Sequence, residues 1–217
     1  MTNDALILFV RNPQKGQVKT RLAAEVGAEE ALRVYKALIS HTRDVAMHVQ
    51  ASRFVWFSDF LEASDNWDPA FFEMRVQEGA DLGERMLRAL CEGLRDHHKV
   101  VLTGSDIPGL SPQLIQHAFT RLDDSDVIIG PAKDGGYYLI GMKKLHPEVF
   151  RDMIWSHPEV LSETCSRMNR LGVRYELIEP LRDLDTPKDY ADLGAEFPNL
   201  FTWLASHDSE DILPSSV

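Results

Sequence analysis

Side chains that could act together on a phosphate group follow three apolar runs of this sequence. A basic cluster comes directly after the run at 5–10 and consists of Arg11, Lys15, Lys19 and Arg21. Asp106 follows a second apolar run, and Asp185 follows a third. Lysine and arginine donate charge-assisted hydrogen bonds to phosphate, while carboxylates are preferred ligands of hard divalent cations. These residue types predict a site for a small phosphate-bearing ligand and a divalent cation.

The basic cluster contrasts with the charge of the whole chain, which has 217 residues and a formal net charge of -11. An acidic balance argues against a nucleic-acid partner and against an anionic membrane, since both require an extended basic face. No apolar run is long enough to span a membrane, and the start lacks the basic segment of a signal peptide. Cys91 and Cys165 lack metal-ligand spacing and are expected to be reduced thiols. We therefore expect a cytoplasmic protein.

Apolar runs alternate with amphipathic segments along the chain. Strands are predicted at 5–10, 53–58, 72–77, 100–106, 126–131, 136–142 and 174–180. Helices are predicted at 27–49, 81–98, 111–122, 158–172 and 185–197. This alternation predicts a three-layer α/β/α sandwich with a mostly parallel central sheet. We expect one domain over residues 1–205, followed by a flexible tail at 206–217.

The candidate residues lie in loops that come just after predicted strands. These loops are the basic cluster and the segments 104–111, 130–138 and 181–187. Because the carboxyl ends of parallel strands meet at one edge of a sheet, the four loops should gather there. Agreement between position and chemistry carries more weight than any single motif.

Asp106 and Asp185 each have an ordinary structural interpretation as well as a metal-binding one. An Asp next to Gly and Pro, as at 106, is common in turns. Asp185 or Thr186 before Pro187 is typical of a helix N-cap, although a capping residue can also bind a cation. Asp183 is a competitor of Asp185 for the same role.

The basic cluster reaches the point where a loop becomes a helix, at Lys19, Thr20 and Arg21. Helix N-termini stabilise phosphate through free N–H groups and the positive end of the dipole. The alternative is a solvated loop with basic side chains. The stretch lacks both the P-loop spacing and G-x-G-x-x-G, so neither of those nucleotide motifs is present.

A glycine-rich segment at 130–138 offers groups that could hold a substrate. Gly135 and Gly136 permit close approach of the backbone, Tyr137 or Tyr138 can contact a ring, and Asp134 can accept hydrogen bonds. A tight turn before a buried strand explains the same residues equally well. Trp155 is open to two interpretations, a ligand contact or plain core. The chain has no G-x-S-x-G and no H-E-x-x-H, so we expect no covalent nucleophile of those kinds.

Five motifs in fixed order resemble a known family. They are "FVRNPQKGQVKTRLAAEVGAEEA", "GADLGERM", "LTGSDIPGLSP", "GPAKDGGYYLIGM" and "RDLDTPKDY". The sequence resembles the glycosyltransferase-like proteins of the nucleotide-diphospho-sugar transferase superfamily, of the selenodomain-associated or arsenosugar-biosynthesis type. It is more distantly similar to phospholactate guanylyltransferases and molybdenum-cofactor nucleotidylyltransferases. The resemblance implies a GT-A-like Rossmann sandwich with Mg2+ or Mn2+.

The resemblance also implies roles for individual residues. It gives Asp106 and Asp185 as the metal ligands, and Lys19, Arg21 and Asp106 as the catalytic residues. Expected nucleotide-binding residues are Arg11, Gly16, Lys19, Arg21, Gly83 and Arg85. Expected substrate-binding residues are Asp134, Gly135, Gly136, Tyr137 and Trp155.

Three functions remain open at this point. Sugar-transferring GT-A enzymes usually have D-x-D at the metal, whereas this chain has Gly104-Ser105-Asp106, which favours nucleotidyl transfer from a nucleoside triphosphate to a phosphorylated acceptor. The alternatives are glycosyl transfer from a nucleotide sugar to a small-molecule acceptor, and a non-catalytic nucleotide-binding module. The sequence leaves the base, the acceptor and the oligomeric state open, a homodimer included.

Overall fold

The structure, a computed structural model, describes residues 3–61, 66–198 and 200. The tail predicted at 206–217 lies outside the described residues. A seven-stranded sheet forms the centre, in the order β3-β2-β1-β4-β6-β5-β7. The strands are β1 Asp4–Val10, β2 Ser52–Phe57, β3 Glu73–Val76, β4 Lys99–Gly104, β5 Val127–Pro131, β6 Tyr137–Met142 and β7 Tyr175–Leu177. The seven predicted strands are therefore all present.

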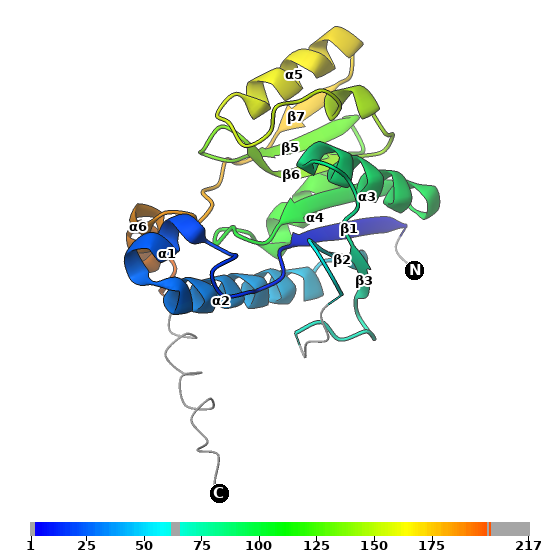
Figure 1. Cartoon of the computed structure of the whole chain (residues 1–217). Coiled ribbons are helices and arrows are strands. Elements are labelled where there is room, and N and C mark those ends of the chain that lie inside the picture. Colours follow the sequence, from blue (N-terminus) through cyan, green and yellow to red (C-terminus); the bar gives the residue numbers. More distant parts are fainter. Residues whose placement is uncertain (1–2, 62–65, 199, 201–217) are drawn as a thin grey trace, which may run out of the picture.

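Helices cover both faces of the sheet, as Figure 1 shows. They are α1 Thr20–Val26, α2 Ala28–Met47, α3 Leu82–Asp96, α4 Pro112–Arg121, α5 Val160–Leu171 and α6 Pro187–Glu196, with a short 3-10 helix, η1, at Pro147–Val149. Core residues of α2 and α4 pack with one set of strand residues, and those of α3 and α5 pack with the other set. The predicted three-layer α/β/α sandwich is confirmed.

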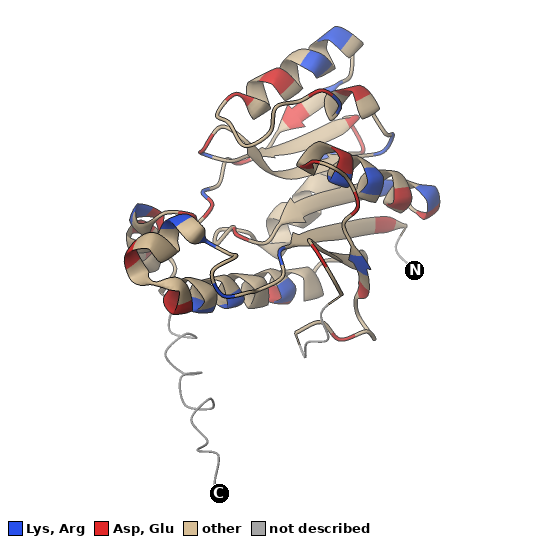
Figure 2. Cartoon of the chain, in the orientation of Figure 1, with Lys and Arg blue, Asp and Glu red and all other residues tan. Residues whose placement is uncertain are grey.

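Side chains of β1 point alternately to the two faces of the sheet, so this strand contributes to the core on both faces. Leu6 and Leu8 belong to the core shared with α2 and α4, whereas Ala5 and Ile7 belong to the core shared with α3 and α5. Successive residues of a strand point to opposite faces, so a central strand must be apolar throughout. The central strands are accordingly almost free of charge. Within β1, β4 and β6, only the first residues of β1 and β4 are charged, and the central strands are mostly tan in Figure 2.

The sheet is parallel except for β6, which runs antiparallel to both of its neighbours, β4 and β5. The carboxyl ends of β1, β4, β5 and β7 therefore face one edge, and β6 starts from that edge. Helices α1 and α6 lie side by side beyond the edge. None of the helices in the described part of the chain has the length and the apolar character needed to cross a membrane.

Candidate functional site

The four loops predicted to gather at the carboxyl edge of the sheet do meet there. The backbone N–H of Lys133 donates to the carbonyl of Leu181 at 3.0 Å, which joins the segment after β5 to the segment after β7. The N–H of Leu184 donates to the carbonyl of Asp106 at 3.0 Å, which joins the segment after β7 to the one after β4. These backbone contacts fix the positions from which the candidate side chains project.

Lys19 lies at the centre of this edge as a buried cation. Its side chain is only 4% exposed, and its Nζ donates to Asp106 Oδ2 at 3.0 Å. The same Nζ lies 3.9 Å from Asp185 Oδ1. The backbone of Lys19 is left-handed, with φ 47°, a conformation that non-glycine residues adopt at a cost and often at functional sites. The alternative interpretation of Lys19 as part of a solvated loop is wrong.

The pKa of Asp106 is lowered because the effect of burial is outweighed by that of Lys19. Burial is the largest influence and alone would raise the pKa of Asp106. The charge and hydrogen bond of Lys19 oppose burial, and the pKa of Asp106 ends below its ordinary value. The carboxylate is thus available at neutral pH as an oxygen ligand or as a partner for a cation.

Arg21 contacts the second aspartate of the site from the solvent side. Its Nη1 donates to Asp185 Oδ2 at 3.2 Å, and its side chain is 75% exposed. Asp185 therefore faces two cations, Arg21 and Lys19. Helix α1, which follows Lys19, has only seven residues, so its dipole adds little to the positive charge of these side chains.

Asp183 differs from Asp185 because no cation of the described residues forms an ion pair with it. Burial raises the pKa of Asp183 to about 6, and the negative charges of Asp134 and Asp106 act in the same direction. Its half-buried side chain thus lies in a negative field that a bound cation would relieve. The sequence indicated this residue only as a competitor of Asp185.

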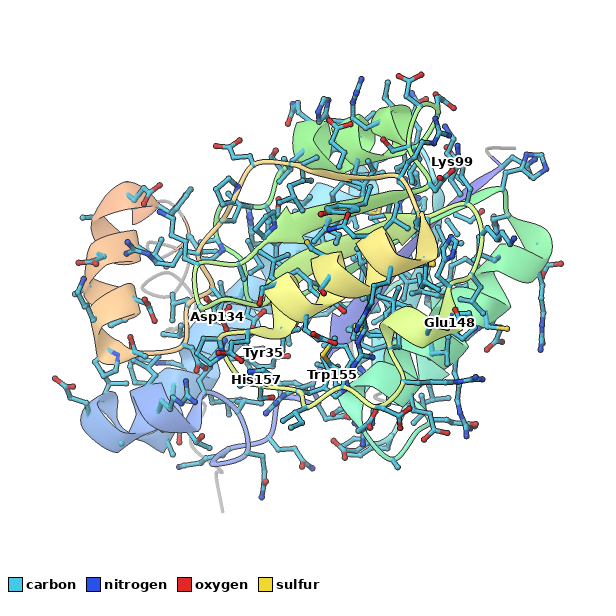
Figure 3. All side chains as sticks on the ribbon, turned by 90° about the horizontal axis from the view of Figure 1, so that it is seen from above. Tyr35, Lys99, Asp134, Glu148, Trp155 and His157 are labelled. Carbon is cyan, nitrogen blue, oxygen red and sulfur yellow. The ribbon has the colours of Figure 1, made fainter. Side chains whose placement is uncertain are left out.

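Tyr35 of α2 contacts Arg11, Ser105 and Lys19 of the cluster, although its place on an apolar helix face gives no sign of this in the sequence. Its Oη accepts a hydrogen bond from the backbone N–H of Arg11 at 2.8 Å and lies 3.2 Å from Ser105 Oγ. The Nζ of Lys19 lies 5.9 Å from the centre of its ring. Figure 3 shows Tyr35 toward the same end of the molecule as Asp134 and His157, away from Lys99. Periodicity alone could not have revealed these contacts.

Asn12 is a second residue that the sequence interpretation missed. Its side chain is buried, accepts from the N–H of Asp59 at 3.0 Å and donates to the carbonyl of Phe60 at 3.0 Å. Asn12 thereby ties the loop after β1 to the loop after β2. An Asn-Pro pair directly after a strand is the only signal of this role in the sequence.

The rings of Tyr137 and Trp155 pack together, with Trp155 against Gly83 near the start of α3. The rings of Tyr137 and Trp155 lie edge to face, with centroids 6.4 Å apart. A Cβ on Gly83 would come within 2.5 Å of the Trp155 ring, so only glycine fits there. Tyr137 Oη and Trp155 Nε1 are buried and have no hydrogen-bond partner within the described residues. Both interpretations of Trp155, core and ligand contact, remain compatible with this packing.

The remaining predicted binding residues lie in turns and loops, or contact neighbouring backbone. Asp134 Oδ1 accepts from the N–H of Gly136 at 2.9 Å, as in a tight turn. Gly135 has φ 96°, and a Cβ there would come within 2.1 Å of the Pro158 carbonyl oxygen. Arg85 Nε donates to the carbonyl of Gly79 at 3.2 Å, and Gly16 has φ 77° in the loop before α1. Contacts that would join Arg85 to the Lys19 cluster are not found in the described chain.

The oxygen donors at the edge suit a hard divalent cation shared with a substrate. Within the described residues, no three acidic, histidine or cysteine side chains converge as a ready-made metal site. Mg2+ is usually held by one or two carboxylates together with substrate phosphates and water, so a complete protein cage is not required. Asp106 could supply one carboxylate, and either Asp185 or Asp183 a second.

Comparison with known proteins gives a family match over more than half of the chain. Residues 41–157 match the family described as "Uncharacterized protein conserved in bacteria (DUF2064)". A comparison with curated proteins gave no match.

Solved structures share the fold over nearly the whole chain. One is a provisionally named nucleotide-diphospho-sugar transferase from Desulfovibrio desulfuricans G20, which is 30% identical, with 96% of each chain covered and a TM-score of 0.87. The inositol-1-phosphate CTP transferase from T. maritima is 14% identical, with 95% of this chain and 97% of that chain covered and a TM-score of 0.54. Rv0371c from Mycobacterium tuberculosis H37Rv, solved in complex with manganese, is 18% identical, with 88% and 96% covered and a TM-score of 0.53. The latter two similarities concern the fold alone.

Proposed function

Because the chain belongs to the bacterial family DUF2064 and to the GT-A-like nucleotide-diphospho-sugar transferase superfamily, we propose that it is a metal-dependent transferase that acts on a nucleotide. The observation that carries the proposal is the contact between Lys19 and Asp106. It joins a side chain suited to phosphate with one suited to a divalent cation, at the sheet edge where α/β proteins bind ligands.

The favoured reaction is nucleotidyl transfer from a nucleoside triphosphate to a phosphorylated acceptor. An oxygen of the acceptor phosphate attacks the α-phosphorus of the nucleotide. The bond between that phosphorus and the oxygen bridging to the β-phosphate breaks, and pyrophosphate leaves with the electron pair. Such a reaction needs positioning and charge stabilisation, and no covalent nucleophile. The inositol-1-phosphate CTP transferase, which shares the fold, is named for a transfer of this general kind.

Lys19 and Arg21 have the roles of binding the outer phosphates and stabilising the leaving pyrophosphate. The Lys19 ammonium has three N–H donors, of which one is directed to Asp106, so donors remain for phosphate oxygens. Arg21 is exposed and can turn from Asp185 toward a ligand. Arg11 and Gly16 belong to the same loop and complete the proposed phosphate cradle.

Asp106, together with Asp185 or Asp183, would hold Mg2+ or Mn2+. When bound, the cation would neutralise phosphate charge and draw electron density from the oxygens of the breaking bond. A relative of the same fold was solved with manganese, which supports the choice of a divalent ion. Lys19 would then keep the carboxylate of Asp106 ionised and oriented before the cation arrives.

The rest of the edge is proposed to bind the nucleoside and the acceptor. The segment around Gly83 and Arg85 would contact the nucleotide. Asp134, Gly135 and Gly136 would approach the acceptor through backbone and carboxylate groups. Tyr137 and Trp155 would line that side, and their buried polar atoms lack partners within the described chain.

Glycosyl transfer from a nucleotide sugar is the second candidate. It is favoured by the provisional name of the relative that is 30% identical. In that reaction a nucleoside diphosphate leaves the anomeric carbon, and Asp134 would contact the sugar or the acceptor. We rank glycosyl transfer second because Gly104-Ser105-Asp106 has a single Asp in place of the D-x-D of sugar-transferring enzymes.

The experiment that separates the two reactions measures what binds and what leaves. A thermal-shift panel compares nucleoside triphosphates with nucleotide sugars of the same base, each with magnesium or manganese. Ligand at a hundred times its dissociation constant should stabilise the protein by about 2.7 kcal/mol. We expect stabilisation by a triphosphate and release of pyrophosphate with an acceptor. Stabilisation by a nucleotide sugar alone, with diphosphate release, would replace the favoured reaction by the second candidate.

A further inference from the structure

Tyr35 contacts Lys19 and two of the segments that surround it at the carboxyl edge. It is a residue of α2 and is 3% exposed. Its hydroxyl contacts the backbone of Arg11, after β1, and the side chain of Ser105, after β4. Its ring faces the ammonium of Lys19. One side chain therefore contacts two strand ends and the buried cation.

We propose that Tyr35 is the positioning residue of Lys19, with its ring supporting the ammonium and its hydroxyl fixing the two strand ends on either side. The ammonium has carboxylates on two sides, since Asp106 Oδ2 lies at 3.0 Å and Asp185 Oδ1 at 3.9 Å. The aromatic face supplies a further side, at 5.9 Å from the ring centre. This distance lies within the range in which a ring face attracts a cation.

The burial of Lys19 should strengthen the contact between its ammonium and the Tyr35 ring. Lys19 side-chain atoms are 4% exposed, so little water competes for the ammonium. A cation–ring contact is stronger when it is desolvated. Lys19 directly precedes α1 in a left-handed conformation, and its ammonium lies over the Tyr35 ring.

The hydroxyl has a separate role in the position of the loop. It accepts from the N–H of Arg11 at 2.8 Å and donates to the Arg11 carbonyl at 3.3 Å. It also lies 3.2 Å from Ser105 Oγ, where either hydroxyl can be the donor. Arg11 begins the loop that ends at Lys19, and Ser105 precedes Asp106. The hydroxyl thus sets the distance between the segment carrying the cation and the segment carrying its partner.

Two substitutions separate the ring from the hydroxyl. Tyr35→Phe keeps the ring and removes the hydroxyl, whereas Tyr35→Leu removes both. Tyr35→Met replaces Tyr35→Leu if that variant does not fold, since methionine fills a similar volume. Tyr138→Phe is the matched control, because its hydroxyl donates to the Glu179 carbonyl at 2.9 Å and does not contact Lys19.

The first measurement is an NMR spectrum of protein labelled at lysine side chains, in the absence of nucleotide. A methylene next to an ammonium above a ring should show a ring-current shift, and the signal is assigned by its loss in Lys19→Ala. We expect the shifted signal in the wild type, Tyr35→Phe and Tyr138→Phe, and its loss in Tyr35→Leu. An unshifted Lys19 signal in the wild type, or the same shift in Tyr35→Leu, would overturn the proposal.

The second measurement rests on the proposed function, because it uses inorganic tripolyphosphate with magnesium as the probe in calorimetry. Tyr35→Leu should weaken binding by about 5- to 30-fold, the range of a cation–ring contact, and Tyr35→Phe should recover most of it. In a Lys19→Ala background, Leu and Phe at position 35 should bind the probe equally. A persisting difference would show that Tyr35 acts independently of Lys19. Unchanged binding by Lys19→Ala alone would reject the phosphate role of Lys19, while the NMR result would still decide the role of Tyr35.

Discussion

Lys19 and Asp106 form an ion pair of 3.0 Å in which the lysine side chain is almost completely buried and the aspartate side chain is 41% exposed. The residues come from the loops after β1 and β4, which are neighbours in the sheet. The pair therefore fastens two strand ends together and places opposite charges at the same point. Its removal should affect stability as well as binding.

Replacing Lys19 by methionine should lower the free energy of unfolding by about 1–3 kcal/mol, because Asp106 then loses its charged partner in a partly buried place. Urea unfolding measures the loss. Lys15→Met is the matched control, since Lys15 pairs with Glu29 at the surface and should change stability by less than about 1 kcal/mol. Adding Asp106→Asn to Lys19→Met should restore part of the stability. An equal loss of unfolding free energy in Lys15→Met and Lys19→Met would contradict a stabilising role of the Lys19–Asp106 pair.

Lys19→Ala and Arg21→Ala should each weaken binding of a nucleoside triphosphate with magnesium by about 1.5–3 kcal/mol, the scale of a charged hydrogen bond. The Arg21 effect should be at the low end and should decrease with salt, because this side chain is 75% exposed. Calorimetry at two salt concentrations measures both. Binding of the free nucleoside serves as the control and should change far less. Wild-type affinity in both variants would remove the opening loop from the site.

Asp106→Asn should reduce the transfer rate on the order of a hundredfold or more, since a charge at the reacting centre is lost. Manganese titration in the presence of nucleotide then tests the second carboxylate. We expect Asp183→Asn to weaken manganese binding more than Asp185→Asn, because Asp185 already faces Lys19 and Arg21. The opposite order would assign Asp185 as the second ligand. Unchanged affinity in Asp106→Asn would exclude Asp106.

Asp183 should make the protein less stable as the pH rises from about 4 to 6. Its pKa is raised in the folded state from 3.8 to about 6, first by burial and then by the charges of Asp134 and Asp106. In this pH window the native state holds more protons than the unfolded state, so the free energy of unfolding falls as the pH rises.

Asp183→Asn removes that titration, so the variant should gain stability relative to the wild type at pH 7.5 but not at pH 4. A Tm difference of at least about 2 °C between these conditions is the expected scale, and thermal unfolding without metal measures it. Asp96→Asn, an exposed position at the end of α3, is the control. A Tm difference independent of pH would show that Asp183 does not titrate in this window.

Most of the fold could be predicted from the periodicity of apolar residues. Buried strands such as β1 and β4 are short continuous apolar runs, and helices such as α4 start at a Ser-Pro pair. Strand direction could not be predicted in this way, because a buried strand has the same pattern in both directions. A clue to the antiparallel β6 did exist, since the five residues between Pro131 and Tyr137 are too few for a parallel crossover.

The candidate site could be predicted less completely, for a different physical reason. Charged residues after strands are visible in the sequence, and these include Lys19 and Asp106. A buried tyrosine on an apolar helix face looks like core, so the contacts of Tyr35 were not visible. The distinction between Asp183 and Asp185 depends on which carboxylate the cations reach, and only the three-dimensional arrangement decides this.

The ion pairs at the carboxyl edge join residues that are far apart along the chain, and this has a consequence for folding. Lys19 and Asp106 are separated by 87 positions, and Arg21 and Asp185 by 164. Contacts of such long range form slowly, because closing a long loop costs chain entropy before the contact can stabilise the fold. The cluster can be complete only after β1, β4 and the segment following β7 have all docked. During refolding, recovery of phosphate binding should therefore follow recovery of helical circular dichroism, and a bound phosphate would report the finished fold.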